Sequence, residues 1–256
     1  MSSGVHLQIS GVEKAFGSRS ILKGIHCELP PGAISVLIGA SGCGKSTLLR
    51  LLIGLISPDA GTLSCNGQPI HSWGPREWGD FRQQVGMVFQ HSALFDSLTV
   101  GENVGFSLRE HTRMSEQEIR VIVAEKLKVV GLAGQEDAYP SELSGGMQKR
   151  VAIARAIARN PSLILYDEPT TGLDPITSTV IEDLIIAVSA QTRATSVVVT
   201  HQISTIQRTA DRIIMLHEGR VLDQGPAEKI LQSTDPLISG FLRGEPARAG
   251  YNESRG

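Results

Sequence analysis

The chain has 256 residues, 41% of them hydrophobic, with a formal net charge of -2 and a pI near 6.4. This length and apolar content allow a sizeable buried core, which excludes a disordered chain and a small domain that depends on disulfides. The near-zero charge and the lack of dense Lys/Arg runs argue against a surface built for nucleic acid.

The cysteines are odd in number and lack metal-type spacing: Cys27, Cys43 and Cys65. We therefore expect reduced thiols in a cytosolic or stromal compartment, with Cys27 and Cys65 as small core residues. We expect no signal peptide, and no apolar run in the sequence reaches the roughly 18 residues that a membrane span needs. If the protein works at a membrane, another chain must supply the span.

The chain opens with a β-rich segment. Alternating apolar residues from Val5 to Ile9 predict a strand, and a turn at 16–18 leads to a second strand from Lys23 to Leu29. Phe16, at this turn, could stack on an adenine ring. The alternative is that Phe16 belongs to the hydrophobic core.

A glycine-rich loop follows the apolar run 33–38 and precedes the apolar run 48–53. This order of strand, loop and helix fits the phosphate-loop pattern G-x-x-x-x-G-K-[ST], whose backbone N–H groups surround phosphates at the positive end of a helix. Lys45 would hold the β and γ phosphates and Ser46 would ligate Mg²⁺. The flanking pattern favours this site over a loop that only turns a strand into a helix. The predicted nucleotide-binding residues are Gly39, Ala40, Ser41, Gly42, Cys43, Gly44, Lys45, Ser46 and Thr47.

A long helical stretch occupies the middle of the chain. Thr62 to Cys65 predicts a short strand, and Val85 to Phe89 predicts a buried strand that ends at Gln90. Helical patterns then cover 100–109, 115–130 and 146–159. We therefore expect an all-helical insertion over 91–160.

Strands and helices alternate again from the apolar strand 163–166, which ends in Asp167 and Glu168. Adjacent acids at the end of a buried strand are costly unless a cation or a catalytic role needs them, although they could simply cap the next segment. His201 stands at the tip of the strand 196–200, where a histidine taken alone is more often structural. The other predicted elements are helices at 177–189, 202–209 and 225–231 and strands at 212–216 and 220–224.

Six pieces of the chain together resemble an ABC-type ATPase subunit. They are the phosphate loop 39–47, Gln90, the signature LSGGMQKR at 143–150, the strand 163–168, the segment TGLD at 171–174 and His201. They stand in the family's order and spacing between residue 5 and about residue 232, which makes chance agreement negligible.

The resemblance implies an α/β fold with a P-loop NTPase core of the ABC type, a β-rich N-terminal subdomain and an all-helical insertion. We expect the ATP-binding core at 1–90 and 161–235 and the helical signature subdomain at 91–160. The remaining 236–256 should form a C-terminal tail, poorly ordered unless a partner holds it.

The resemblance also implies ATP and Mg²⁺ as cofactors, with catalysis by positioning and charge. Asp167 should hold Mg²⁺ through water, together with Ser46 and with Gln90, which should also contact the attacking water. Glu168 should polarise that water as general base, and His201 should contact the γ-phosphate. Lys45 completes the predicted catalytic set.

The signature predicts a second anion site. Ser144, Gly145 and Gly146 precede a long helix, so their N–H groups and the Ser144 hydroxyl can bind an anion, with no phosphate loop of their own nearby. In the family two copies pair head to tail, and each ATP lies between the phosphate loop of one chain and the signature of the other. Asp174, by resemblance, couples the two sites. Catalysis then requires a second copy of this chain.

The chain has a single cassette and no sustained heptads. ABC ATPases that act on nucleic acid or ribosomes usually carry two cassettes or a long coiled coil. The resemblance therefore implies a transport ATPase with no nucleic-acid partner, held by a polytopic permease at the cytoplasmic face of an inner, or plastid inner, membrane.

The segment after Gln90 resembles one group of these transporters. It carries Q-x-x-A-L-F followed by N-V and L-R-E-H-T up to residue 112, and MQKRV at 147–151 and DPIT at 174–177 match the same group. The group is the Mla-type ATPases that drive phospholipid transport with MCE-domain proteins, including the related chloroplast lipid importer. The alternative is the ATPase of a polar amino acid or other small-solute importer. Leu94 and Phe95 would either receive a short helix of the permease or belong to the core of the insertion.

Overall fold

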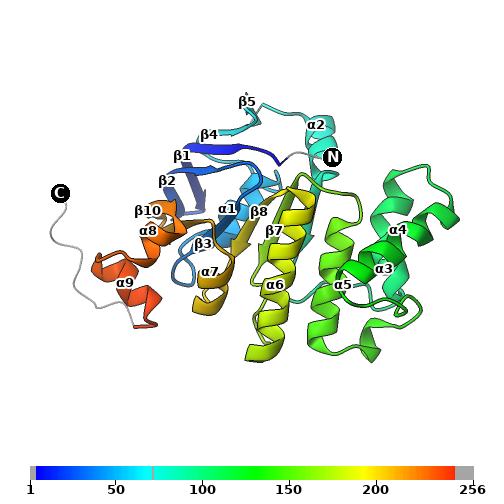
Figure 1. The fold of residues 1–256 in the computed structure, drawn as a ribbon. Coiled ribbons are helices and arrows are strands. Elements are labelled where there is room, and N and C mark those ends of the chain that lie inside the picture. Colours follow the sequence, from blue (N-terminus) through cyan, green and yellow to red (C-terminus); the bar gives the residue numbers. More distant parts are fainter. Residues whose placement is uncertain (1–3, 71, 246–256) are drawn as a thin grey trace.

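The computed structural model describes residues 4–70 and 72–245, whose strands form two sheets (Figure 1). The smaller, antiparallel sheet consists of β1 (Leu7–Phe16), β2 (Arg19–Leu29), β4 (Ala60–Cys65) and β5 (Gln68–Pro69). The larger sheet consists of β3 (Ile34–Ile38), β6 (Val85–Val88), β7 (Leu163–Asp167), β8 (Thr195–Val199), β9 (Arg212–His217) and β10 (Arg220–Pro226). Its order is β10-β9-β3-β8-β7-β6, parallel throughout except that β10 runs antiparallel to β9.

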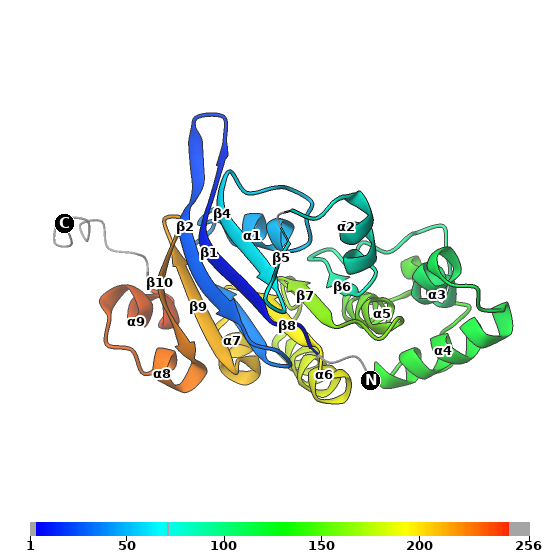
Figure 2. The ribbon, with the colours of Figure 1, turned by 90° about the horizontal axis from the view of Figure 1, so that it is seen from above.

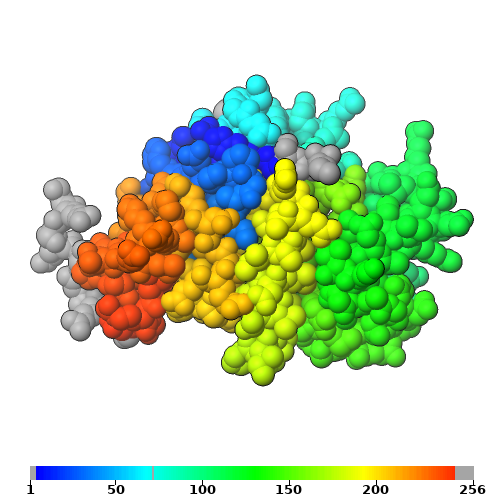
Figure 3. Space-filling view, in the orientation of Figure 1, coloured from blue at the N-terminus to red at the C-terminus, as the bar shows by residue number. Residues whose placement is uncertain are grey.

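The described helices pack around these sheets or form a separate lobe. They are α1 (Lys45–Leu52), α2 (Pro75–Arg82), α3 (Val100–His111), α4 (Glu116–Val129), a 3-10 turn at Pro140–Glu142, α5 (Gly145–Ile157), α6 (Pro175–Thr192), α7 (Ile203–Thr209), α8 (Ala227–Leu231) and α9 (Pro236–Leu242). In the space-filling view α3, α4 and α5 form a lobe at one end of the molecule (Figure 3). This lobe holds the predicted signature.

The central sheet separates two hydrophobic cores because successive side chains of a strand point to opposite faces. On β3, Val36 and Ile38 pack with residues of α5, α6 and α7, whereas Leu37 packs with residues of α1, β1 and β2. Figure 2 shows β1 and β2 lying over the central sheet as a long hairpin. Both faces of β3 are therefore covered, which fixes the loop that leaves its carboxyl end.

The α/β fold with a β-rich N-terminal part is confirmed, and within 91–160 the described regular elements are all helical. The domain boundaries at residues 90, 160 and 235 stay a prediction. α2 was not predicted, although its start carries ordinary signals. Pro75 occupies the first helical position, and the Glu77 carboxylate accepts a hydrogen bond from the N–H of Gly74 at 3.0 Å.

The prediction of a poorly ordered chain beyond Pro236 is wrong for the part that the structure describes. Asp235 caps α9 by accepting hydrogen bonds from the N–H groups of Leu237 and Ile238. The Ile238 side chain is buried in the main core, which is the core that contains Val36 and Ile38 of β3. A capped turn that buries an apolar residue outweighs the helix-breaking composition around it. The rest of the predicted tail, 246–256, lies outside the described residues.

None of the helices in the described ranges is long and apolar enough to cross a membrane. Cys27 and Cys65 are buried and unpaired, as predicted, and burial raises the pKa of the Cys27 thiol to about 12. Their role is packing.

Candidate active site

The glycine-rich loop follows the path that the sequence predicts, from the end of β3 into α1. Gly39, Gly42 and Gly44 have φ values of 142°, 79° and 112°, in the region that L side chains rarely adopt. A Cβ at Gly39 would also collide with the carbonyl oxygen of Leu216, and one at Gly44 with the side chain of Leu22. The loop can take this shape only with glycine at these positions.

The start of α1 is suited to an anion. Its N-cap residue, Gly44, offers no side-chain oxygen, and its described first turn holds no acidic residue. The N–H groups of a helix start need acceptors when no side chain caps them, and the helix dipole adds partial positive charge there. A phosphate group satisfies both requirements.

Lys45 lies over the loop and is held by it. Its Nζ donates hydrogen bonds to the carbonyl oxygens of Gly39 at 2.7 Å and Ala40 at 3.1 Å. The Cys43 side chain, within the loop, is buried. Burial raises the pKa of its thiol, although the charge of Lys45 opposes the rise. Cys43 and Ala40 therefore shape the loop through their backbone, and Lys45 supplies the cation.

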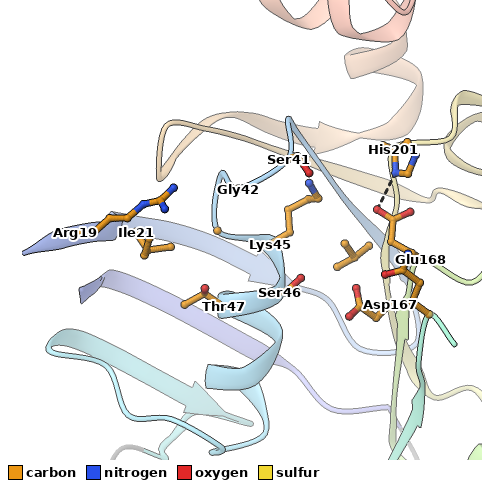
Figure 4. Close-up of a pocket in the computed structure, with 13 residues that line it drawn as sticks. Arg19, Ile21, Ser41, Gly42, Lys45, Ser46, Thr47, Asp167, Glu168 and His201 are labelled. Carbon is orange, nitrogen blue, oxygen red and sulfur yellow. Dashed lines mark hydrogen bonds and ion pairs between the residues drawn. The ribbon is translucent and has the colours of Figure 1, made fainter. Parts of the chain in front are cut away.

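Residues from distant parts of the chain meet the loop in one open cavity of about 440 Å³ (Figure 4). Gln90 comes from the end of β6, Asp167 and Glu168 from the end of β7, and His201 from the segment after β8. The carboxyl ends of neighbouring parallel strands share one edge of the sheet, which brings these side chains together. The predicted residues that line the cavity are Ser41, Gly42, Gly44, Lys45, Ser46, Thr47, Gln90, Asp167, Glu168 and His201.

Asp167 is a carboxylate whose charge the fold disfavours. Burial raises the pKa of Asp167, and the charge of the adjacent Glu168 raises it further, against the opposing charges of Arg50, Lys45 and Lys149. A cation at this carboxylate would relieve both effects.

The donor set around Asp167 fits Mg²⁺. The Ser46 hydroxyl, the Gln90 amide and the Asp167 carboxylate line the same cavity, and hard oxygen donors are the ligands that Mg²⁺ prefers. In the part of the chain that the structure describes, no cluster of three or more His, Cys, Asp or Glu forms a protein cage for a metal.

Glu168 is held in a strained and well-determined position. Its φ of 50° is unusual for a residue with a side chain, and such strain, about 1–3 kcal/mol, persists where the surroundings enforce it. Its N–H donates to the carbonyl oxygen of Val199 at 2.9 Å, and its carboxylate accepts from the Thr171 hydroxyl at 3.1 Å. His201 Nδ1 lies 2.9 Å from the other carboxylate oxygen. The dashed line in Figure 4 marks this contact. Glu168 is thus aimed into the cavity rather than capping the next segment.

Two cations of α5 hold the loop that follows Gln90. Lys149 Nζ donates to the carbonyl oxygen of Gln90, and Arg155 donates to those of Ser92 at 2.8 Å and Ala93 at 2.6 Å. Burial lowers the pKa of Lys149, and the charges of the two acids at the end of β7 counteract this. The signature helix is therefore tied to the residue predicted to contact the metal.

The signature and Asp174 lie outside the cavity. Ser144 caps α5 by accepting from the N–H of Met147, and Asp174 caps α6 by accepting from the N–H groups of Ile176 and Thr177. Gly146 packs directly against the side chain of Thr177, so the starts of the two helices lie together. Among the described lining residues, Ser144, Gly145, Gly146 and Asp174 are absent.

Phe16 is 49% exposed, so its alternative placement in the core is wrong. Its ring lies 5.7 Å from Lys14 Nζ and is not among the described lining residues of the cavity. Arg19 and Ile21, across the turn on β2, do line it and were not predicted. No motif marks them, because only the packing of the β1–β2 hairpin over the loop brings them there.

The family model for ABC transporters matches residues 22–171, more than half of the chain. The chain belongs to the ABC transporter family. It is one of the family's ATP-hydrolysing subunits, as the phosphate loop, the acids at the end of β7 and the signature predict.

Several proteins of this ABC transporter family are similar over most of the chain. "Probable ribonucleotide transport ATP-binding protein mkl" of Mycobacterium leprae is 41% identical over 95% of this chain and 70% of its own length. "Protein TRIGALACTOSYLDIACYLGLYCEROL 3, chloroplastic" of Arabidopsis thaliana is 44% identical over 94% of this chain and 74% of its own. "Intermembrane phospholipid transport system ATP-binding protein MlaF" of Haemophilus influenzae is 42% identical over 92% and 90%. The dimeric ATP-binding cassette MJ0796 bound to ADP and Pi covers 86% of this chain and 98% of its own, with a TM-score of 0.78 and 34% identity.

The strained charge of Asp167 generates a prediction about stability. Asp167→Asn keeps the size of the side chain and removes a charge that the fold disfavours above the ordinary pKa of an aspartate. At pH 7 without nucleotide the variant should therefore unfold at a higher temperature than the unchanged chain. The difference should shrink as the pH falls and the wild-type Asp167 takes up its proton.

Thermal unfolding followed by circular dichroism between pH 4.5 and 8 measures this, with Asp80→Asn on the exposed face of α2 as the control. MgATP should stabilise Asp167→Asn less than the unchanged chain, because a carboxylate predicted to hold Mg²⁺ is gone. A variant less stable at pH 7, or a gap that widens on acidification, contradicts the account.

Proposed function

We propose that this chain hydrolyses ATP as a head-to-tail dimer beneath a membrane permease, and that the cargo is phospholipid delivered through an MCE-domain partner. The observation that carries the ATPase part is the cavity in which Lys45, Asp167, Glu168 and His201 meet. The place of action is the cytoplasmic face of the permease's membrane, an inner membrane or the plastid inner membrane, where the chain is peripheral.

The residues divide the work of hydrolysis. The loop N–H groups and Lys45 bind the phosphates, and Glu168 accepts the proton of the water whose oxygen attacks the γ-phosphorus as the bond to ADP breaks. Because Nδ1 lies against Glu168, His201 would contact the γ-phosphate through Nε2. Ser46, Gln90 and Asp167 would hold Mg²⁺, which when bound would neutralise charge on the phosphate oxygens.

The second half of the site comes from another copy of the chain. The helix start at Ser144, Gly145 and Gly146 offers N–H groups to an anion but lies outside the cavity of its own chain. A dimer in which this start faces the partner's ATP gives the γ-phosphate donors on both sides. The similarity to a dimeric cassette that holds ADP and Pi supports this arrangement. Asp174, beside Gly146 through Thr177, would link the two sites.

The permease is proposed to dock in a second groove, which begins where the ATP cavity ends. Gln90 lines the cavity, and Phe89, the residue before it, lines the groove together with Phe95 and Phe106. The rings of Phe95 and Phe106 lie 4.8 Å apart, and Phe95 is 44% exposed, whereas Leu94 packs against the main core. Leu94 therefore belongs to the core, whereas Phe95 lies on the surface, where it could contact a helix of the permease.

The chemistry of the groove favours a short helix with apolar and acidic side chains. Besides the aromatic rings, its lining includes cations at Arg82, Arg155 and Arg159. An apolar anchor in a pocket with a charged rim is a common form of helix recognition. Movement of the docked helix would be passed to Gln90 through a single peptide unit.

The cargo rests on the relatives. MlaF of Haemophilus influenzae and of Escherichia coli is named for intermembrane phospholipid transport, and the segment from Gln90 to Thr112 carries the pattern of that group. Other relatives carry different names, for ribonucleotide transport in mkl and for methionine import in MetN of Geobacillus kaustophilus. The lipid assignment therefore needs a direct test.

Glu168→Gln tests the proposed base. The amide keeps the size of the side chain and cannot accept the proton, so hydrolysis in the assembled complex should fall by about 10²-fold or more while ATP still binds. The ATP-bound dimer should accumulate, visible by size-exclusion chromatography with MgATP. Asp183→Asn, an exposed acid on α6, serves as the control. Hydrolysis by Glu168→Gln at the unchanged rate means that Glu168 is not the base.

Phe95→Asp tests the groove. An added carboxylate in place of an exposed apolar ring should abolish co-purification of the membrane chains and leave ATP binding unchanged, because Phe95 is not among the described lining residues of the ATP cavity. The matched control is Val121→Asp, which changes an exposed apolar residue on α4 outside the groove. Equal recovery of the permease with both variants contradicts the docking site.

The native complex from the same purification identifies the cargo. Mass spectrometry should find a permease, an MCE-domain protein and bound phospholipid. Recovery of a soluble amino-acid-binding or nucleotide-binding protein instead would exclude the lipid assignment and leave the ATPase assignment intact.

A further inference from the structure

A buried carboxylate behind the active site has no part in the mechanism above. Glu182, in the middle of α6, has an exposed fraction of 0%. Its Oε1 accepts hydrogen bonds from the Ser204 hydroxyl at 3.1 Å and the Thr205 hydroxyl at 2.8 Å. Arg208 Nε lies 2.9 Å from Oε2 as an ion pair, at an angle that does not make a hydrogen bond.

Packing alone gives no reason for this residue. Its neighbours on the buried face of α6 include the apolar Ile181 and Ile185, and an apolar side chain at position 182 would pack without the cost of burying a charge. A buried charge of this kind makes sense where it fixes the direction of hydrogen bonds around it.

The directions of the hydrogen bonds follow from the donors and acceptors present. An ionised carboxylate only accepts, so Thr205 must donate its one hydroxyl proton to Glu182. The Thr170 hydroxyl lies 3.0 Å from that of Thr205, whose proton is already used, so Thr170 must be the donor of this second bond. The result is a series of two hydrogen bonds, from Thr170 to Thr205 and from Thr205 to Glu182, in which each hydroxyl proton has one position. Both threonine side chains are buried.

These hydrogen bonds tie together three segments that adjoin the proposed site. Thr170 lies two residues after Glu168, Thr205 lies four residues after His201 on α7, and Glu182 belongs to the helix that Asp174 caps. The strained backbone at Glu168 needs such enforcement, since a φ of 50° persists only where the surroundings hold it.

We propose that Glu182 is a positioning residue for the Glu168 and His201 pair, acting through Thr205 and Thr170. This rests on the roles proposed above for Glu168 and His201. Glu182 is not among the described residues that line the ATP cavity. It sets the distance between the segment after β7 and the segment after β8, across which the base and the histidine meet.

Two substitutions of Thr205 separate positioning from packing. Thr205→Val keeps the shape of the side chain and removes the hydroxyl, whereas Thr205→Ser keeps the hydroxyl and removes a methyl group. In the assembled full-length complex Thr205→Val should lower kcat about tenfold, the effect of one misdirected hydrogen bond, with KM for ATP within about twofold of the unchanged chain. Thr205→Ser should retain most of kcat. If packing matters instead, Thr205→Ser should have a lower kcat than Thr205→Val, and that result overturns the proposal.

A double-variant cycle gives a readout that a general loss of stability would not change. If Thr205 acts by aiming Glu168, Thr205→Val should cause no further loss of residual hydrolysis in the Glu168→Gln background. A further tenfold loss there contradicts the proposal. Nucleotide binding by each variant shows whether it is folded.

A matched pair of acids completes the test. Glu182→Gln removes the buried charge and should lower kcat several-fold, whereas Asp183→Asn should leave it unchanged, although Asp183 pairs with the same Arg208 at 2.6 Å. Equal effects of the two overturn the proposal. The outcomes also separate it from the proposed function. An active Glu168→Gln refutes the base itself, whereas an inactive Glu168→Gln with a fully active Thr205→Val refutes only the role of Glu182.

Discussion

Two adjacent carboxylates at the end of a buried parallel strand are the constraint on which the rest of this structure depends. Burial and the neighbouring Glu168 both raise the pKa of Asp167, and the surroundings of the two acids show what is needed to keep them. Glu168 has a strained backbone and partners on both carboxylate oxygens, and Lys45 and Lys149 supply opposing charge. A bound Mg²⁺ would supply positive charge beside Asp167 that the protein alone does not. The site therefore keeps a carboxylate whose charge the fold disfavours, which is the usual trade of stability for function.

The site is connected both to the signature helix and to the second groove. Gln90 shares the cavity with the two acids, while its carbonyl oxygen is held by Lys149 of the signature helix and its neighbour Phe89 lines the second groove. With the role proposed for Gln90, a change at the γ-phosphate would reach the helical lobe and the groove without passing through the hydrophobic core. Interfaces of this kind are bistable rather than continuously deformable, so small shifts can produce a discrete change.

Sequence reasoning found the parts of the fold that local patterns determine. The phosphate loop was predictable because its glycines, Lys45 and the flanking apolar runs are contiguous, and the acids at 167 and 168 because they end an apolar strand. Arg19 lines the cavity only through hairpin packing, and the chain from Thr170 to Glu182 joins residues on different elements, so neither has a local signal. The segment beyond Asp235 has a capping signal, but its glycines and prolines favour irregular structure, and the burial of Ile238 that stabilises α9 has no local signal.

The most direct test of the shared site uses two kinds of mixed dimer that carry the same two substitutions. In one, Lys45→Ala and Ser144→Arg are on the same chain and the other chain is unchanged; in the other, each chain carries one of them. A head-to-tail dimer leaves one intact pair of phosphate loop and signature when the substitutions are on different chains and none when they are on one chain. The account therefore predicts ATP hydrolysis only by the dimer with divided substitutions. Hydrolysis only by the dimer with both substitutions on one chain would show that each chain completes its own site, and would contradict it.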